Sequence, residues 1–166
     1  MKSVCRLTAS RLRINTGAIM KNLPHQYQAS ASAGPEGEVS LVCEGADAIV
    51  SAAPVEFGGP GGRWSPETLL AAAIADCFIL TFRAVAVAMK LIWIAVYCNV
   101  EGTLDREQGK TRFTGFKVTV RLHVPPDTDE ARAVILLQKA KDGCFIANSL
   151  SATIDFEMAI TVEPAA

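Results

Sequence analysis

The stretch from Ser65 to Lys90 constrains the fold more than any other part of the chain, because it is long and almost entirely apolar. It predicts a helix that begins at Ser65, the residue that can serve as N-cap. Pro66 fits the first helical position, where its missing N–H would have no partner. Glu67 then places a negative charge near the positive end of the helix dipole. The start of this helix is therefore well specified.

This helix lacks the polar side that would face water. Between Leu69 and Met89 the clearly polar side chains are Asp76, Thr81 and Arg83. A membrane span is long enough in principle, but Asp76 and Arg83 would then lie in hydrocarbon at a cost of about 2.5–3.5 kcal/mol each. We therefore expect no membrane association. Instead, we expect a central helix covered nearly all round by a sheet and by a second subunit.

Length, charge and cysteine content bound the class of protein. A chain of 166 residues suits one domain, and its net charge of −1 gives no attraction to nucleic acid or to an anionic membrane. Half of the residues are hydrophobic, which favours a large core or a buried oligomer interface. No two cysteines form a C-x-x-C motif, and no apolar signal-peptide core is present, so we expect a reducing cytoplasm. The five cysteines are Cys5, Cys43, Cys77, Cys98 and Cys144.

The N-terminus differs in composition from the rest. Residues 1–19 are basic and contain no acidic residue, and they include Cys5. We expect a disordered arm there, followed by a single domain over residues 20–166. No cofactor or metal site is predicted, because no phosphate loop occurs in the glycine-rich stretch 54–64. The cysteines, His25 and His123 also lack the spacing of metal ligands.

Short antiparallel strands are predicted before the helix. Turn formers recur at 34–37 and 44–47, and apolar residues alternate between them, which indicates a meander of three strands from Tyr27 to Ser51. Cys43 lies on the apolar alternation of this segment. We therefore interpret it as a small core residue.

A strand hairpin is predicted after the helix. Apolar residues alternate from Ile92 to Val100 and again from Phe116 to Val124, and the turn lies within Asp105–Lys110. Cys98 follows the apolar alternation and is interpreted as structural. His123 follows the polar alternation, which predicts a solvated histidine.

The C-terminal part predicts one more helix and one more strand. Asp127 and Glu130 can form a capping box for a helix that continues to about Lys141 and ends at Gly143. A last strand is expected over 154–162. The order of strands, long helix, hairpin, helix and strand indicates an α+β fold with mixed or antiparallel pairing.

Cys77 and Cys144 stand apart from the other cysteines. Cys77 lies inside the central helix beside the glycine-rich loop, and Cys144 directly follows a helix end, so the two thiols could share a cleft. Spacing leaves open the simpler alternative that both are buried and inert.

The stretches FGGPGGRWSPETLLAAAIADCF and QKAKDGCFIANSL resemble the two cysteine motifs of the OsmC/Ohr family, the osmotically inducible protein C and organic hydroperoxide resistance proteins. The resemblance extends over the order of elements from about Met20 to Val162. It implies an intertwined homodimer with central cysteine-bearing helices flanked by sheets. It further implies a peroxidase of organic hydroperoxides, in which Cys77 is peroxidatic and Cys144 resolving. The reductant would be a thiol such as dihydrolipoamide or a lipoylated protein.

In this family an arginine held by a glutamate favours the reactive thiolate. Glu67 matches the glutamate, but no arginine occurs between Tyr27 and Phe57 where the best-known pattern has it. Arg63 is our candidate, with Glu67 orienting its guanidinium, and Arg83 is the fallback unless it pairs with Asp76. Phe145 is a second departure, because the family commonly has proline there.

A second hypothesis remains beside the enzyme. A dimeric binding or redox-sensing protein with an apolar ligand pocket would have the same helices and thiols but would not turn over peroxide.

Overall fold

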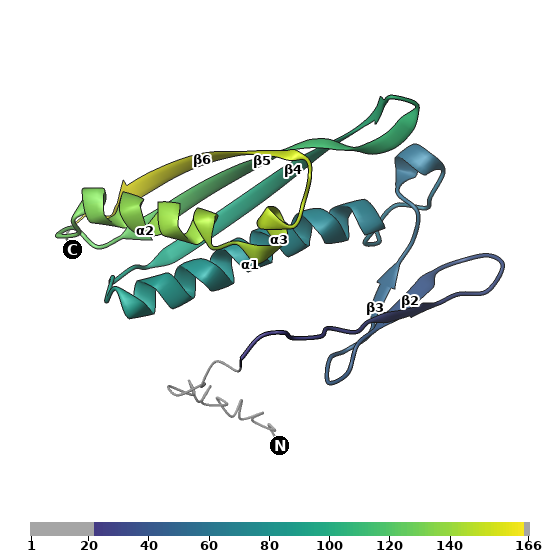
Figure 1. Ribbon diagram of the computed structural model, residues 1–166, viewed down its shortest axis with the longest axis horizontal. Coiled ribbons are helices and arrows are strands. Elements are labelled where there is room, and N and C mark those ends of the chain that lie inside the picture. The colour runs from purple at the N-terminus through teal and green to yellow at the C-terminus, as the bar shows by residue number, and fades with distance from the viewer. Residues whose placement is uncertain (1–21, 165–166) are drawn as a thin grey trace, which may run out of the picture.

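The computed structural model describes residues 22–164, so the predictions for residues 1–19, including Cys5, lie outside the described residues. Within 22–164 the chain forms two three-stranded sheets and the helices α1, α2 and α3 (Figure 1). The predicted α+β class is confirmed.

Helix α1 runs from Pro66 to Ala88 and begins as predicted. The Ser65 N–H donates to Thr68 Oγ1 at 2.8 Å, and the Thr68 N–H donates to Ser65 Oγ at 3.2 Å. This capping box gives hydrogen-bond partners to two backbone N–H groups at the helix start. Ser65 is buried, so the N-terminus of α1 is fixed firmly to the loop before it.

The larger sheet has the order β4-β5-β6. Strands β4 (Ala95–Glu107) and β5 (Lys110–Val124) form an antiparallel hairpin, and β6 (Thr153–Val162) pairs in parallel with β5. The hairpin turns at Gln108-Gly109, both with positive φ, as a tight primed turn requires. Because β5 and β6 are parallel, the chain must cross over between them, and α2 lies in that crossover.

The first strand of this hairpin begins later than predicted. Ile92 and Ile94 are 75% and 55% exposed, whereas Trp93 packs edge-on against Phe82 at a centroid distance of 5.5 Å. Before Ala95 the alternation is therefore reversed. Trp93 faces α1, and Ile92 and Ile94 face away from it, because the connection from α1 places Trp93 against the helix. From Val96 onward the alternation is as predicted.

The C-terminal helices are α2 (Glu130–Asp142) and α3 (Phe145–Asn148). The N-cap of α2 is Asp129, whose side chain accepts from the Arg132 N–H at 3.1 Å, and not Asp127 as predicted. The turn that follows the two prolines extends to Thr128, whose N–H donates to the Pro125 carbonyl, so helical geometry begins two residues later. Gly143 ends α2 as expected.

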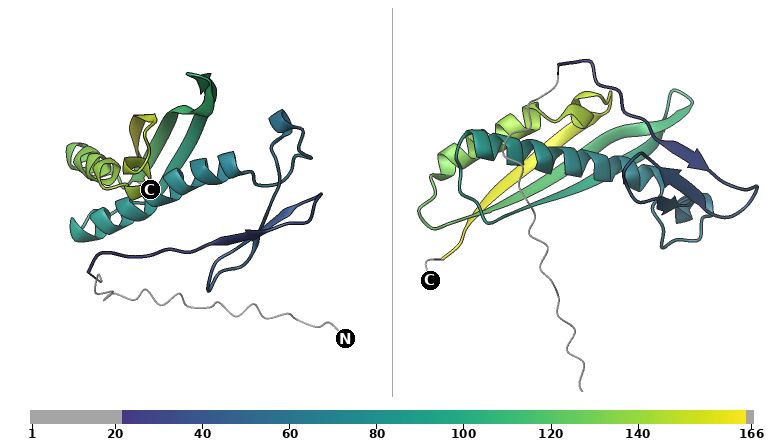
Figure 2. Two further views of the ribbon diagram at one scale, coloured as in Figure 1. Left: turned by 45° about the vertical axis from the view of Figure 1, so that its right-hand side comes forward. Right: turned by 90° about the horizontal axis from the view of Figure 1, so that it is seen from below.

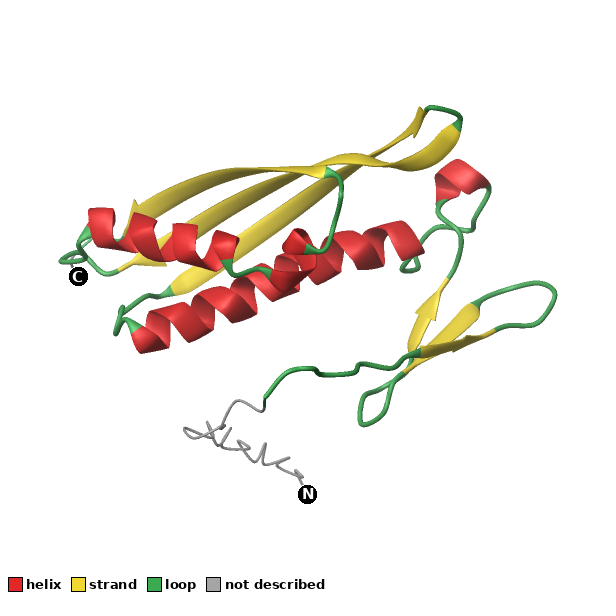
Figure 3. Ribbon diagram, viewed as in Figure 1, coloured by secondary structure: helices red, strands yellow, loops and turns green. Residues whose placement is uncertain are grey.

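All three helices lie on one face of the larger sheet (Figure 3). The core lies between these layers. Its largest fully buried side chains come from α1, β5 and α2, together with Cys144: Ile74, Phe78, Phe82, Val118, Val120, Leu122, Val124, Leu136, Leu137 and Cys144.

The smaller sheet contains β1 (Ser30–Ser32), β2 (Val39–Val42) and β3 (Ile49–Ser51), and a short 3₁₀ turn at Val55–Phe57 follows it. The predicted antiparallel meander is confirmed. Its strands pack mainly against one another, off the N-terminal end of α1 (Figure 2). Cys43 is exposed, so its assignment to the core was wrong. Strand β2 ends at Val42, so Cys43 lies just beyond the paired part of the sheet.

One chain covers α1 on a single side. The face with Ile74, Phe78, Phe82 and Ala86 is buried, whereas Leu80 and Val87 are 51% and 80% exposed. By length and composition α1 could cross a membrane, a criterion that core helices of soluble proteins also meet, and 22% of its most apolar window is buried within the chain. The cover expected on nearly all sides therefore needs something beyond this chain.

The packing around Gly102 generates a prediction. A Cβ at Gly102 would lie 2.8 Å from ring atoms of both Phe113 and Phe116, whose stacked rings have centroids 4.9 Å apart. We expect Gly102→Ala to lower the free energy of unfolding by about 1–3 kcal/mol, the usual cost of overpacking. At Gly115 the nearest atom would be 3.7 Å away, so Gly115→Ala is the matched control. Equal urea midpoints for the two variants would contradict this account.

Candidate functional site

The thiols of Cys77 and Cys144 meet at the middle of α1. Cys144 Sγ donates to the Ile74 carbonyl of α1 at 3.9 Å, and the Cys144 side chain also interacts with that of Cys77, one turn further along the helix. Cys144 is fully buried, whereas Cys77 is half-buried. The structure therefore brings together the two cysteines that the sequence singled out.

The chain around Cys144 is shaped to approach α1 closely. Gly143 ends α2, and a Cβ at this position would lie 3.1 Å from Thr81 Cγ2. Cys144 then serves as the N-cap of α3, and its carbonyl accepts from the Asn148 N–H at 3.0 Å. The close backbone approach at Gly143 and the short helix after it together hold the Cys144 thiol against α1.

Burial raises the pKa of Cys144 to about 11; the backbone of Ala147 opposes this rise, and the interaction with the Cys77 side chain adds to it. A thiol with this pKa stays protonated near neutral pH, and the thiolate is the form that attacks peroxides. The two thiols are therefore chemically different: Cys144 is sheltered and protonated, and Cys77 is the one of the pair that reaches the surface.

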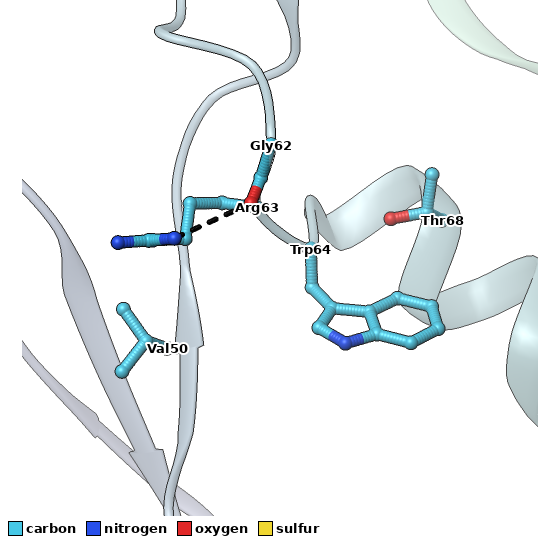
Figure 4. Close-up of a pocket in the computed structure, with 5 residues that line it drawn as sticks. All are labelled: Val50, Gly62, Arg63, Trp64 and Thr68. Carbon is cyan, nitrogen blue, oxygen red and sulfur yellow. Dashed lines mark hydrogen bonds between the residues drawn. The ribbon is translucent and has the colours of Figure 1, made fainter.

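Arg63 points away from the thiols in this chain. Its guanidinium forms an ion pair with Glu38, beside the start of β2, and both side chains are about half exposed. Figure 4 shows the Arg63 side chain extending past Val50, on the opposite side from Thr68. The reason is the loop geometry: Trp64 pairs with Ser51 of β3, which sets Arg63 beside the smaller sheet.

The contact predicted between Glu67 and Arg63 is therefore absent. Glu67 Oε2 is buried and has no hydrogen-bond partner among the described residues. A buried polar atom without a partner costs roughly 1–3 kcal/mol, more when it is charged. Within residues 22–164, Glu67 Oε2 therefore still needs a hydrogen-bond donor.

Arg83 does not pair with Asp76 either. Both are exposed, and the ion pairs found within residues 22–164 do not join them. Seven residues along a helix separate them by about 10 Å, which is too far for a direct contact even though they share a face. Arg83 therefore remains available as the fallback.

Cys98 has two environments in the structure, whereas the sequence pattern had indicated the core alone. Cys98 packs against the cluster that contains Cys144, and it also lines a surface cavity. Its apolar alternation had correctly indicated the face toward the helices. That Cys98 packs against the same core cluster as Cys144 depends on tertiary packing and has no sequence signal.

His123 is less solvated than predicted. Its Nδ1 lies 2.6 Å from Glu163 Oε1, and Tyr97 packs edge-on against its ring at 5.4 Å. The parallel β6 strand carries Glu163 to this position, beside β5. The histidine lies on the outer face of the sheet, away from Cys77.

Comparison with known proteins agrees with this arrangement. The model of the OsmC-like protein family matches residues 59–159. An organic hydroperoxide resistance protein of Xanthomonas axonopodis pv. citri is 33% identical over 135 residues, which cover 80% of this chain and 91% of that protein.

Solved structures show the same fold. An organic hydroperoxide resistance protein OsmC from Legionella pneumophila is 29% identical, with a TM-score of 0.61 over 84% of this chain and 99% of that one. An OsmC-like protein of unknown function from Vibrio cholerae is 18% identical, with a TM-score of 0.73 over 81% of this chain and 99% of that one. The chain described here belongs to the OsmC-like protein family.

Proposed function

We propose that this protein is a thiol peroxidase that reduces organic hydroperoxides to alcohols. The observation that supports this most is the contact between a partly buried thiol, Cys77, and a fully buried one, Cys144. A name referring to organic hydroperoxide resistance among the relatives supports the same chemistry.

The chemistry requires this asymmetry. The Cys77 thiolate attacks the distal peroxide oxygen, the alcohol leaves, and Cys77 becomes a sulfenic acid. The Cys144 thiol then attacks the Cys77 sulfur, and water leaves as the disulfide forms. Because Cys144 is buried, it is protected from direct oxidation while it waits for this step.

A second copy of the chain would complete the site. Glu67 and Cys77 are ten positions apart on α1, about 15 Å along the axis, so one arginine cannot contact both within a single chain. An antiparallel pair of α1 helices crossing near Ala72 would place Glu67 of the partner subunit beside Cys77. The alanines at 71–73 allow such helices to approach closely. This antiparallel pairing of helices would also cover the exposed face of α1.

The oxidised enzyme needs an external reductant. As the resemblance to the family implies, we assign this role to a dithiol such as dihydrolipoamide, free or attached to a lipoylated protein. A reducing cytoplasm is the matching compartment.

One observation favours the binding-protein alternative. An apolar cavity of about 560 Å³ lies between the smaller sheet and the start of α1, lined by Leu41, Phe57, Glu67 and Leu69 among others. A lipid-like ligand would fit its chemistry. In that case peroxide would not be consumed, although a ligand would bind.

The disulfide predicted by the peroxidase mechanism can be mapped directly. One equivalent of cumene hydroperoxide, followed within seconds by acid quenching and non-reducing peptide mapping, should yield first a Cys77–Cys144 bridge. Cys77→Ser should abolish peroxide consumption, whereas Cys144→Ser should consume one equivalent and stop at the sulfenic acid.

Cys43→Ser is the matched control, because Cys43 is exposed and far along the chain from the pair. It should behave as the wild type. A first bridge that excludes Cys77 or Cys144, or no bridge at all, would contradict the mechanism.

The role of Arg63 generates a separate prediction. In the paired helices the partner subunit's Arg63, four residues before Glu67, would exchange Glu38 for Glu67 and lie beside Cys77. Arg63→Ala should then slow the reaction of Cys77 with cumene hydroperoxide by roughly a hundredfold, the order seen when one electrostatic donor is removed from a reacting centre. Arg63→Lys should lose nearly as much, since lysine lacks the planar fork. Arg83→Ala serves as the comparison.

The measurement is the pH dependence of Cys77 alkylation in the wild type and in the three variants. The assignment requires a shifted profile for Arg63→Ala and an unchanged one for Arg83→Ala. The reverse pattern would move the role to Arg83, and two unchanged profiles would favour the binding-protein alternative.

A further inference from the structure

Arg63 is bound to one carboxylate in the structure and is needed at another by the function proposed above. Its guanidinium forms an ion pair with Glu38, which directly precedes β2. Glu67 follows Arg63 by four residues in the same chain, and its Oε2 has no hydrogen-bond partner within residues 22–164. The two carboxylates are therefore rivals for one guanidinium.

The ion pair between Arg63 and Glu38 joins two solvent-exposed side chains, which are 50% and 47% exposed. Within the described part of the chain, the other hydrogen bond of the guanidinium runs from Arg63 Nη1 to the neighbouring Gly62 carbonyl at 3.4 Å. Exposed ion pairs are weak, because water competes for both charges and salt screens them. Glu38 consequently holds Arg63 in a position that it can leave.

The loop that carries Arg63 can adjust over a short stretch. Before that stretch the Gly59 N–H donates to the Pro54 carbonyl at 3.0 Å, and after it an isolated bridge holds Trp64 to β3. Between these two anchors, Gly61 and Gly62 both have positive φ, and a Cβ at Gly62 would meet nothing within 4 Å. Arg63 can therefore move while the smaller sheet and α1 stay in place.

Open space lies between Arg63 and the start of α1. A cavity of about 570 Å³ is lined by Val50 and Arg63 on one side and by Thr68 on the other (Figure 4). Thr68 follows Glu67 on the first turn of α1, so this space leads from Arg63 toward the turn that carries the second carboxylate. The residues that line the cavity lie outside the core cluster, so the guanidinium can cross it without repacking of the core.

We propose that Glu38 is a positioning residue that regulates the peroxidase by holding Arg63 in a resting position. The site becomes fully reactive when Arg63 leaves Glu38 for Glu67 of the same chain, beside Cys77 of the partner subunit. This inference rests on the peroxidase function and on the role of Arg63 proposed above. It adds a residue that acts through Arg63 and contacts neither the peroxide nor a thiol.

Competition between the two carboxylates gives Glu38 an unusual sign of effect. Because the resting side chain points away from α1, the guanidinium cannot serve both carboxylates at once. Each Arg63 that is paired with Glu38 leaves one site without its cation, so the Cys77 thiolate of that site is disfavoured. Removal of the Glu38 charge should therefore make the enzyme faster, although it removes an ion pair.

The rate of the first oxidation of Cys77 tests this expectation. At low salt, Glu38→Gln should raise the second-order rate constant of Cys77 with cumene hydroperoxide about twofold to fivefold, the range that an exposed ion pair allows. Acid quenching followed by alkylation of the remaining Cys77 thiol measures it. Glu38→Asp keeps the charge and should restore most of the wild-type rate.

Glu36→Gln is the matched control. Glu36 is exposed, lies two residues before Glu38, and takes part in none of the ion pairs found within residues 22–164. Its replacement removes the same charge from the same turn without touching Arg63. The rate constant should stay at the wild-type value.

Two further measurements separate positioning from a structural effect of Glu38. In about 1 M sodium chloride, where the Debye length is about 3 Å, the rate constants of Glu38→Gln and wild type should become equal. In an Arg63→Ala background, Glu38→Gln should have no effect on the rate, because the residue through which Glu38 acts is gone. A gain that came from general loosening of the loop would persist under both conditions.

The possible failures are distinguishable. If Arg63→Ala slows Cys77 but Glu38→Gln is no faster than wild type at low salt, the resting role of Glu38 is overturned and the peroxidase function stands. The same holds if the gain in Glu38→Gln survives Arg63→Ala. If Arg63→Ala leaves the rate unchanged, the role of Glu38 falls with that of Arg63, and if the wild type consumes no peroxide, the peroxidase function falls as well.

Discussion

The structure depends on the packing of α1, a helix whose sequence is apolar on every side but which one chain covers on only one side. The sheet, α2 and α3 bury the row from Ile74 to Ala86, and this contact organises the whole C-terminal part of the chain. The opposite side leaves Leu80 and Val87 exposed. Large exposed apolar surfaces favour association, so this uncovered side is the surface that we propose a second copy of the chain covers.

The same helix sets the chemistry of the site. Cys144 is anchored to α1 at the Ile74 carbonyl and shielded from water, and Cys77 projects from the next turn. Burial raises the pKa of Cys144 to about 11, so this thiol stays protonated near neutral pH, as the resolving role that we propose for it allows. The Glu67 oxygen ten positions earlier has no hydrogen-bond partner within residues 22–164, and a second copy of the chain is the donor that we propose for it.

Much of the fold could be predicted because local signals agreed with tertiary packing. The N-cap at Ser65, the alternation in β5 and the end of α2 at Gly143 depend on neighbouring residues, and all three are confirmed. Cys43 and Ile92 were assigned to the wrong environments, because alternation shows which residues share a face but not whether that face is covered. The N-cap of α2 was misplaced by two residues, because Asp127 and Asp129 are both of a residue type that caps helices.

The site could be predicted only in part. The motifs indicated Cys77 and Cys144, and the structure brings these thiols together. The pairing of Arg63 with Glu38 could not be read from spacing, because it depends on how the smaller sheet sits beside the loop before α1.

The central claim is that each site combines Cys77 of one chain with Glu67 of the other, and subunit complementation tests it most directly. Cys77→Ser and Glu67→Gln should each be inactive or nearly so as pure proteins. After equal amounts are unfolded and refolded together, half of the dimers should be mixed, and each mixed dimer should contain one intact site. The account predicts peroxide turnover with dihydrolipoamide at about a quarter of the wild-type rate. A mixture as inactive as its components, with mixed dimers shown to be present, would contradict it.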